Sequence, residues 1–229
     1  MQGILPNISA DYEILKNCDV VFVCVPMNKT LEVLDKLESV VSADTVVTDV
    51  CSLKMFVCEK ERPYIFIPSH PMAGTEQKGF ESSFNGLFDN AKWVITPCFP
   101  VKKESREKLE KIITDMGASI VTTTPKDHDR AVAMISHMPM VVSQALFLAA
   151  SENKLALEIA ASGFRDMTRL AMSNEEMACD MVNMNAENIQ NAILRLYKAM
   201  GELTGKNYPQ IIHSIKEQRS EMFTHQKHS

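Results

Sequence analysis

The feature that most constrains the fold of this chain is a change of pattern near residue 125. Before it, five short runs rich in β-branched and other apolar residues are predicted to be strands, at 20–26, 45–50, 64–68, 92–97 and 119–124. Such nearly continuous apolar runs are typical of parallel strands that are covered on both faces. Helical patterns separate several of them, and Gly117 is placed to end the helix predicted before it. Alternating strands and helices predict a doubly wound α/β sheet.

After Thr124 the period is helical, and no convincing strand appears up to about Gln218. One long helix is predicted over 127–152, with a bend at Pro139. Another is predicted over 173–203, with Ser173 as N-cap and Glu176 completing a capping box. These helices have more apolar surface than a lone pair could bury, so we expect them to form a homodimer. The predicted domains are 1–125 and 126–229.

The composition of the 229 residues excludes several classes of function. Lys and Arg number 24 against 29 Asp and Glu, the opposite of the bias of a duplex-binding protein, so no nucleic-acid partner is expected. Six scattered cysteines without a Cys-x-x-Cys pair indicate reduced thiols in a cytoplasmic protein, with no metal site. The amino-terminal stretch carries Asp11 and Glu13, and the apolar run 138–150 is interrupted by Ser143 and Gln144. Neither a signal peptide nor a membrane span is therefore expected.

Polar residues follow three of the predicted strands. The first ends on Pro26 and is followed by Asn28, Ser52 follows the second, and Ser69-His70 follows the third. Ligands of open parallel sheets bind outside the carboxyl ends of the strands, so Ser52 and His70 would converge on one rim if their strands are neighbours. The alternative is that the ring of His70 is satisfied by the backbone of a turn. Both interpretations of His70 stay open at this point.

Four segments occur in the order in which one known family has them: DVCSLK, SHPMAGTEQKGFESSFNGLFDNAKWVITP, DHDRAVAMISHMP and SGFRDMTRLAMSNEEM. Together they resemble the prephenate/arogenate dehydrogenase family of tyrosine biosynthesis, over essentially the whole chain. The resemblance implies a partial Rossmann-type dinucleotide-binding domain over 1–125 and an all-α substrate-binding and dimerisation domain over 126–229. It implies oxidative decarboxylation of prephenate to 4-hydroxyphenylpyruvate, with hydride transfer to NAD, NADP not being excluded. Arogenate, the amino counterpart, is the alternative substrate.

The resemblance also implies roles for single residues. His70 would accept the proton of the C4 hydroxyl of the substrate, a task suited to an imidazole with an ordinary pKa of about 6.5. Ser52 would be its hydrogen-bonding neighbour, and Arg169 would bind a substrate carboxylate through its guanidinium fork. The other candidates are His137, Gly74, Thr75 and Asp166 for the substrate, and Pro26 and Ser52 for the cofactor.

Purely structural roles stay open for two of these candidates, and one further histidine is expected to have no role in the reaction. Asp166 is equally well explained as a helix-surface partner of Arg169. His137 is also explained as a core histidine on a long helix. His128 is predicted to be a residue of a helix amino terminus without a part in the chemistry.

The sequence departs from the family in three places. Met140 stands where the family often has a second histidine, and Ala178 stands where it often has an aromatic residue. None of the eight glycines forms Gly-x-Gly-x-x-Gly, and the first strand resembles the family's fourth. We therefore expect the βαβ unit that cradles the pyrophosphate to be missing, and Met1 to be an internal or misassigned start or the start of a truncated gene. The rival hypotheses are a non-catalytic dimerising or ligand-sensing remnant and another Rossmann dehydrogenase with a helical second domain.

Overall fold

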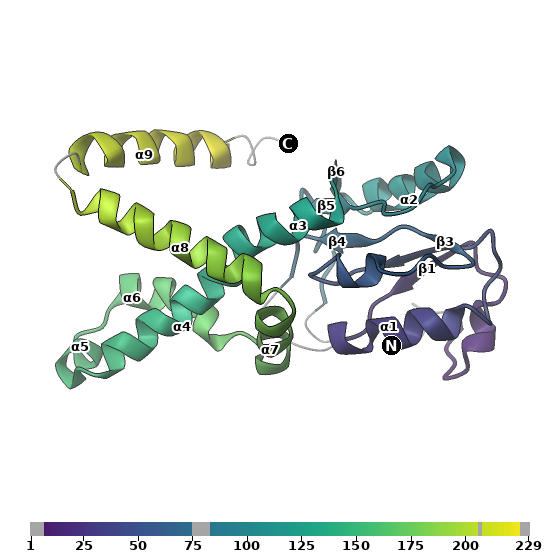
Figure 1. Cartoon of the computed structure of the whole chain (residues 1–229), viewed down its shortest axis with the longest axis horizontal. Coiled ribbons are helices and arrows are strands. Elements are labelled where there is room, and N and C mark those ends of the chain that lie inside the picture. Colours follow the sequence, from purple (N-terminus) through teal and green to yellow (C-terminus); the bar gives the residue numbers. More distant parts are fainter. Residues whose placement is uncertain (1–6, 75–82, 206–207, 225–229) are drawn as a thin grey trace. The chain divides into compact units, whose positions relative to one another are not determined.

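A computed structural model describes residues 7–74, 83–205 and 208–224, and the chain divides into two compact units (Figure 1). The first unit contains the residues up to 74 together with 85–128, and the second contains the described residues 83 and 84 together with residue 129 onwards. The boundary between the units therefore falls within a helix, α3 (Pro125–Val132). Thr75, one of the predicted substrate-binding residues, lies outside the described residues.

The described part of the first unit contains two three-stranded sheets. One has the order β1-β2-β3 with parallel pairing throughout, and the other has the order β4-β5-β6, in which β4 is antiparallel to β5 and β5 is parallel to β6. The strand bounds are β1 (Val20–Val23), β2 (Val46–Asp49), β3 (Ile65–Phe66), β4 (Ser69–Pro71), β5 (Lys92–Ile95) and β6 (Ser119–Thr122).

All five predicted runs contain a strand, but the chain after Phe66 differs from the prediction. Ile67 still belongs to the first sheet, because its N–H donates to Val47 O at 2.9 Å. Pro68 has no N–H with which to continue that ladder, and its carbonyl accepts from Thr96 N at 2.9 Å. The chain thus passes from one sheet to the other, and His70 lies within the separate antiparallel strand β4 instead of following a parallel one.

The helices of the first unit are two α-helices and two 3-10 turns in the described part: η1 (Tyr12–Leu15), α1 (Met27–Leu37), η2 (Phe56–Cys58) and α2 (Lys103–Asp115). The buried face of α1 carries Leu34 and Leu37, which pack against the first sheet, whereas Leu31 is 39% exposed. Leu109 and Ile113 of α2 pack against Trp93. Gly117 ends α2 as predicted, with a φ of 90° that favours glycine.

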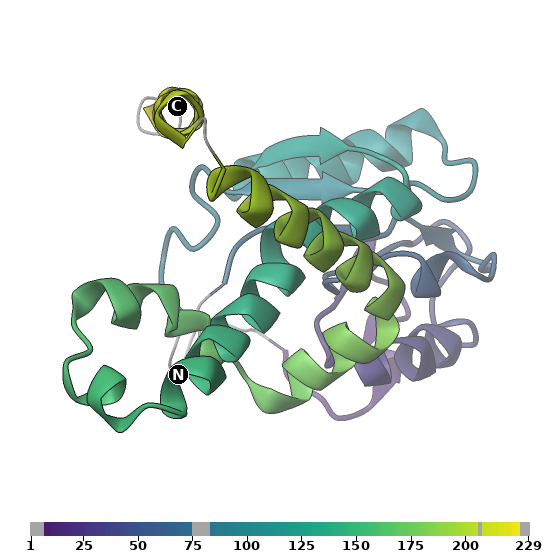
Figure 2. The same ribbon diagram turned by 60° about the vertical axis from the view of Figure 1, so that its left-hand side comes forward.

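The second unit is built around one helical run, which Figure 2 shows from the side. Its part of the run starts within α3, at Asp129, and continues through η4 (Ala133–His137) into α4 (Met138–Ser151). The N–H of Met138 donates to Ala133 O, five residues earlier, so η4 is a π-helical turn. Pro139 lacks the N–H that would bond to Ile135 in a regular helix, and its ring would collide with that carbonyl. The structure thus has a π turn directly before Pro139, the residue at which a bend was predicted.

The remaining helices are α5 (Lys154–Glu158), α6 (Ser162–Met167), η5 (Arg169–Met172), α7 (Glu175–Met184), α8 (Ala186–Leu203) and α9 (Tyr208–Thr224). The helix predicted over 173–203 is therefore two helices with a break at Asn185. The predicted N-cap is also wrong by one residue: Asn174 accepts from Met177 N at 3.0 Å, while the Ser173 hydroxyl donates to Leu170 O at 2.7 Å. Asn caps a helix as well as Ser does. Helix α8 packs against both η4 and α4.

Candidate active site

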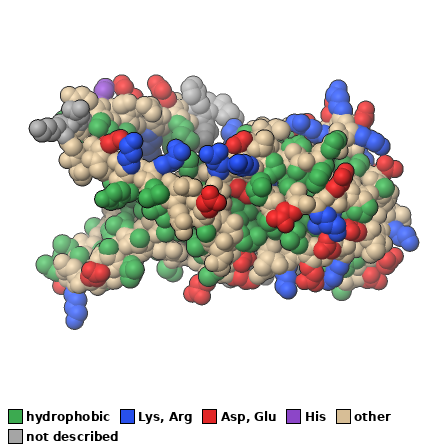
Figure 3. Space-filling view, in the orientation of Figure 1, with side chains coloured by type: hydrophobic (Ala, Val, Ile, Leu, Met, Phe, Trp, Pro, Cys, Tyr) green, Lys and Arg blue, Asp and Glu red, His purple; other side chains and the backbone are tan. Residues whose placement is uncertain are grey.

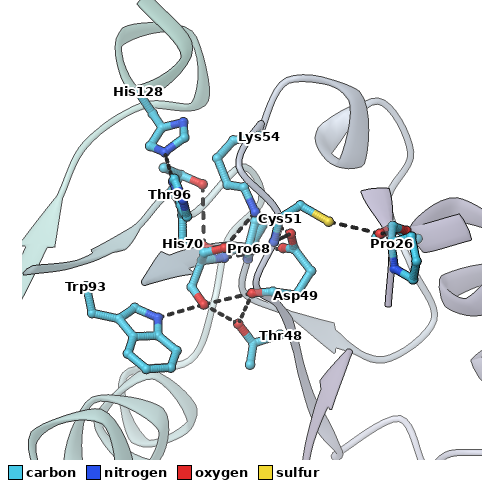
Figure 4. Close-up of polar contacts among 12 residues, drawn as sticks. Pro26, Thr48, Asp49, Cys51, Lys54, Pro68, His70, Trp93, Thr96 and His128 are labelled. Carbon is cyan, nitrogen blue, oxygen red and sulfur yellow. Dashed lines mark hydrogen bonds and ion pairs between the residues drawn. The ribbon is translucent and has the colours of Figure 1, made fainter. Parts of the chain in front are cut away.

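An ion pair between Asp49 and Lys54 lies at the carboxyl end of β2, and both side chains are 0% exposed. The two carboxylate oxygens of Asp49 also accept from Cys51 N at 3.0 Å and from Ser69 N at 3.3 Å. The Lys54 ammonium donates further to Ser69 O at 2.6 Å. Buried charges persist only when they are paired and hydrogen-bonded. This network (Figure 4) therefore holds the loop after β2 against the start of β4.

The hydroxyl of Ser69 fixes the residue that precedes His70. It donates to Asp49 O at 2.9 Å, accepts from the indole Nε1 of Trp93 at 2.9 Å, and lies 2.8 Å from the hydroxyl of Thr48. Ser69 is 0% exposed, so these contacts lie in the interior of the unit. The backbone at His70 is consequently held from both sheets.

His70 is half-buried in β4, opposite Val94 of β5. Its Nδ1 lies 2.9 Å from Nε2 of His128, and the two ring centroids are 5.1 Å apart (Figure 4). His128 comes from the first turn of α3 and is 2% exposed. We predicted no part in the chemistry for His128, and the structure places it in contact with the predicted base.

Ser52 is half-buried in the loop after β2. Among the described residues no hydrogen bond joins it to His70, so the predicted neighbour relation is not seen. The reason is the path of the chain: His70 belongs to the second sheet, and its ring meets α3 instead of the loop after β2. A catalytic role for Ser52 stays a prediction.

The candidate cofactor residue Pro26 is the N-cap residue of α1, at the junction after β1. Its carbonyl accepts from the hydroxyl of Thr30 at 3.3 Å, and that hydroxyl lies 2.9 Å from Sγ of Cys51. The loops after β1 and β2 are thus tied together. Burial, and to a lesser degree the charge of Asp49, raises the pKa of Cys51 to about 12.

Gly74 is exposed, and a Cβ at this position would meet nothing within 4 Å. The packing of the described residues therefore does not require glycine there. Close approach of a ligand to this backbone stays a prediction.

Arg169 and Asp166 lie in the second unit and line one cavity of about 550 Å³. Its other lining residues are Phe147, Arg165, Thr168, Ala171 and Met172. Asp166 Oδ1 lies 3.8 Å from Nε of Arg165, and the side chain of Arg169 lines the same cavity. Guanidinium groups beside an apolar wall suit a ligand that carries a carboxylate on a ring. Arg165 stands in the same motif as the other two residues but was not among the predicted site residues.

His137 lies at the end of η4 and is 1% exposed. Its Nδ1 is 3.2 Å from the side-chain nitrogen of Asn185, which also donates to Asp129 O at 2.9 Å. These contacts fix the start of α8 against the central helical run. Substrate contact by His137 stays a prediction, because its ring lies inside the helical unit.

An α/β unit whose parallel strands are flanked by helices, followed by a helical unit with a cavity that two arginines line, defines a Rossmann-type two-domain protein. Two family models match nearly the whole chain. Residues 2–122 match "Prephenate dehydrogenase, nucleotide-binding domain", and residues 124–225 match "Prephenate dehydrogenase, dimerization domain". The chain belongs to the prephenate dehydrogenase family.

Individual relatives agree with this assignment. The prephenate dehydrogenase of Bacillus subtilis is 33% identical over 185 residues, which cover 76% of this chain and 50% of that protein. The structure of Synechocystis arogenate dehydrogenase matches with a TM-score of 0.79 and 30% identity, over 95% of this chain and 82% of that one. Prephenate dehydrogenase from Aquifex aeolicus, in complex with hydroxyphenyl propionate and NAD+, matches with a TM-score of 0.72 and 27% identity, over 91% and 74%. The chain spans about half the length of the curated relatives it matches.

Proposed function

We propose that the chain carries the catalytic and substrate-binding residues of a dehydrogenase that oxidatively decarboxylates prephenate to 4-hydroxyphenylpyruvate, or arogenate in its place. The observation that carries the proposal is His70 itself. A half-buried imidazole lies on a strand whose backbone is fixed by the buried Asp49–Lys54 pair. The arginines of the second unit and membership of the family support the same reaction.

In this proposal His70 accepts the proton of the C4 hydroxyl while carbon dioxide leaves C1. The ring becomes aromatic, which supplies most of the driving force, so the protein has mainly to place a hydrogen-bond acceptor and to bind carboxylates. A base that is held in place before the substrate arrives lowers the barrier further. Arg169 binds a substrate carboxylate, with Arg165 adding positive charge and Asp166 lying beside the guanidinium group of Arg165.

A nicotinamide cofactor, NAD or NADP, accepts the hydride from C4 when it is bound. Pro26 and Ser52, which follow β1 and β2, are the residues that we place against its nicotinamide end, in the position that ligands of parallel sheets take. The pyrophosphate end fits less well. The printed sequence contains no Gly-x-Gly-x-x-Gly, and α1 follows a proline instead of a glycine turn.

We also propose a homodimer that forms through the helices of the second unit. Helix α8 exposes large apolar side chains, with Leu194 at 65%, Tyr197 at 77% and Met200 at 55%, and Figure 3 shows apolar side chains over these helices. Exposed apolar surface of this kind marks an association site. The run Pro125–Ser151 is also long and apolar enough to cross a membrane, a test that core helices of soluble proteins pass as well. The proposed state of the protein is therefore a dimer in the cytoplasm, without a membrane or nucleic-acid partner.

The proposed function is tested with the chain fused behind a complete glycine-rich βαβ unit of a dinucleotide-binding domain. Formation of reduced nicotinamide is measured with prephenate and with arogenate, each with NAD and with NADP. Turnover of either substrate is expected. A folded fusion that binds the cofactor and oxidises neither substrate would leave the dimerising remnant as the better hypothesis.

The 229-residue chain without the fused unit is expected to bind NAD weakly or not at all, because its sequence has no glycine turn for the pyrophosphate. Calorimetric titration measures this directly. A micromolar dissociation constant for the printed chain would contradict our view of its cofactor site.

A further inference from the structure

We infer that His128 is a positioning residue that accepts a hydrogen bond from Nδ1–H of His70 and so fixes the tautomer in which Nε2 of His70 carries the lone pair of the base. The inference rests on the proposed function of His70. It extends that function to a residue for which the sequence suggested none. The observation behind it is the 2.9 Å distance between Nδ1 of His70 and Nε2 of His128.

Three strands and one capped helix bring these two residues together across 58 positions of sequence. His70 pairs with Val94 of β5, and Val94 pairs with Val121 of β6. Helix α3 starts directly after β6, where the hydroxyl of Thr124 accepts from Asp127 N at 3.1 Å. The N–H of His128 then donates to Thr124 O at 2.9 Å. The position of the His128 ring is therefore set by the sheet that carries His70.

A hydrogen bond between two imidazoles has room for one proton, so two arrangements are possible. If His128 donates from Nε2, His70 must carry its own proton on Nε2 and cannot accept another there. If His70 donates from Nδ1, its Nε2 keeps a lone pair and can take the proton of the substrate hydroxyl. Only the second arrangement is compatible with a base at Nε2.

The hydrogen bond between His70 and His128 becomes stronger as His70 takes up the proton of the substrate. When Nε2 of His70 takes a proton, the ring becomes a cation, and its Nδ1–H···Nε2 bond to His128 becomes charge-assisted and stronger. An interaction that strengthens along the reaction raises the turnover number and leaves ground-state binding unchanged. His128 is 2% exposed, so water does not replace it as the acceptor.

The tautomer of His70 is tested by ¹⁵N NMR of the 229-residue chain, labelled with ¹⁵N at its histidines. The signals of His70 are assigned from their loss in the His70→Asn variant. We expect His70 to be protonated on Nδ1 in the parent chain. His128→Leu removes the acceptor and should give a mixture of tautomers. His128→Gln, whose amide oxygen also accepts, should restore the Nδ1–H form. The control is His213→Gln, at an exposed position of α9, which should leave the spectrum of His70 unchanged.

Kinetics of the fusion with a βαβ unit supply the second readout. His128→Leu should lower kcat roughly 10- to 100-fold, the effect of losing one charge-assisted hydrogen bond, with KM for the substrate unchanged. His128→Gln should recover most of that loss. A parent chain with the proton on Nε2 of His70, or a His128→Leu variant with the same tautomer as the parent, would overturn the inference. If instead the tautomer behaves as expected but His70→Asn retains full turnover, the proposed function of His70 fails and the contact with His128 stands.

Discussion

At the scale of single residues, burial changes the chemistry of a thiol beside the candidate site. Cys51 is 5% exposed and lies next to the Asp49 carboxylate, and its pKa is raised to about 12, first by burial and then by that charge. Only the thiolate reacts with alkylating reagents. A pKa well above the assay pH keeps the group protonated, so the folded protein should protect it.

We therefore expect iodoacetamide at pH 8 to modify Cys179, which is exposed on α7, and to leave Cys51 unmodified in the native chain. Peptide mass spectrometry after short exposure distinguishes the two sites. Both should react at similar rates in concentrated urea, which provides the control. Equal rates in the native protein would contradict the described environment of Cys51.

At the scale of elements, the buried ion pair connects the loop after β2 with β4. Lys54→Met removes the ammonium and leaves the Asp49 carboxylate buried without its counter-charge. Loss of one partner of a buried pair typically costs about 3–5 kcal/mol of stability. Urea unfolding followed by circular dichroism should show a loss of this size.

The matched control is Lys60→Met, because Lys60 pairs with Asp35 and Glu38 while its side chain remains 55% exposed. Its effect on the unfolding midpoint should be small, since solvent screens exposed pairs. If the two variants unfold at the same urea concentration, the Asp49–Lys54 pair does not hold these elements together.

Periodicity and local chemistry predicted most elements from the sequence. The β-branched runs are strands, and Gly117 ends its helix with a positive φ. What local pattern could not provide was the route of the chain at Pro68, because an antiparallel strand of three residues looks like the end of the strand before it. The break at Asn185 depends on a hydrogen bond to Asp129, far away in sequence. The proline marks locally where the first ladder ends, but neither the pairing of the chain after it nor the break at Asn185 has a local signal.

The candidate site was predictable only in part, because some of its contacts also depend on residues far apart in sequence. His70, Arg169 and Asp166 were found through motifs, and the structure places the last two in one cavity. His128 was missed because its contact with His70 depends on the register of β4, β5 and β6 together. The only local signal was its place in the first helical turn after a strand that reaches the same sheet.

At the scale of the whole molecule, the exposed apolar side chains of the second unit predict association. Sedimentation equilibrium at micromolar concentration should give the mass of a dimer, twice the 25.7 kDa of one chain. Replacing Leu194 and Tyr197 of α8 with aspartate should shift the equilibrium toward monomer if these side chains lie in the interface. A monomeric parent chain at that concentration would contradict the prediction.

The most direct test of the proposed chemistry compares His70→Asn with Arg169→Ala in the fusion that carries a complete βαβ unit. His70→Asn keeps a hydrogen-bonding group but removes the base, so kcat should fall by ~10²–10⁴-fold. Arg169→Ala removes a carboxylate contact made in both the ground state and the transition state, so KM should rise while kcat changes little. Steady-state kinetics with the preferred substrate therefore separates the two roles. Near-parental turnover in a folded His70→Asn variant would show that His70 is a structural residue of β4 and not the base.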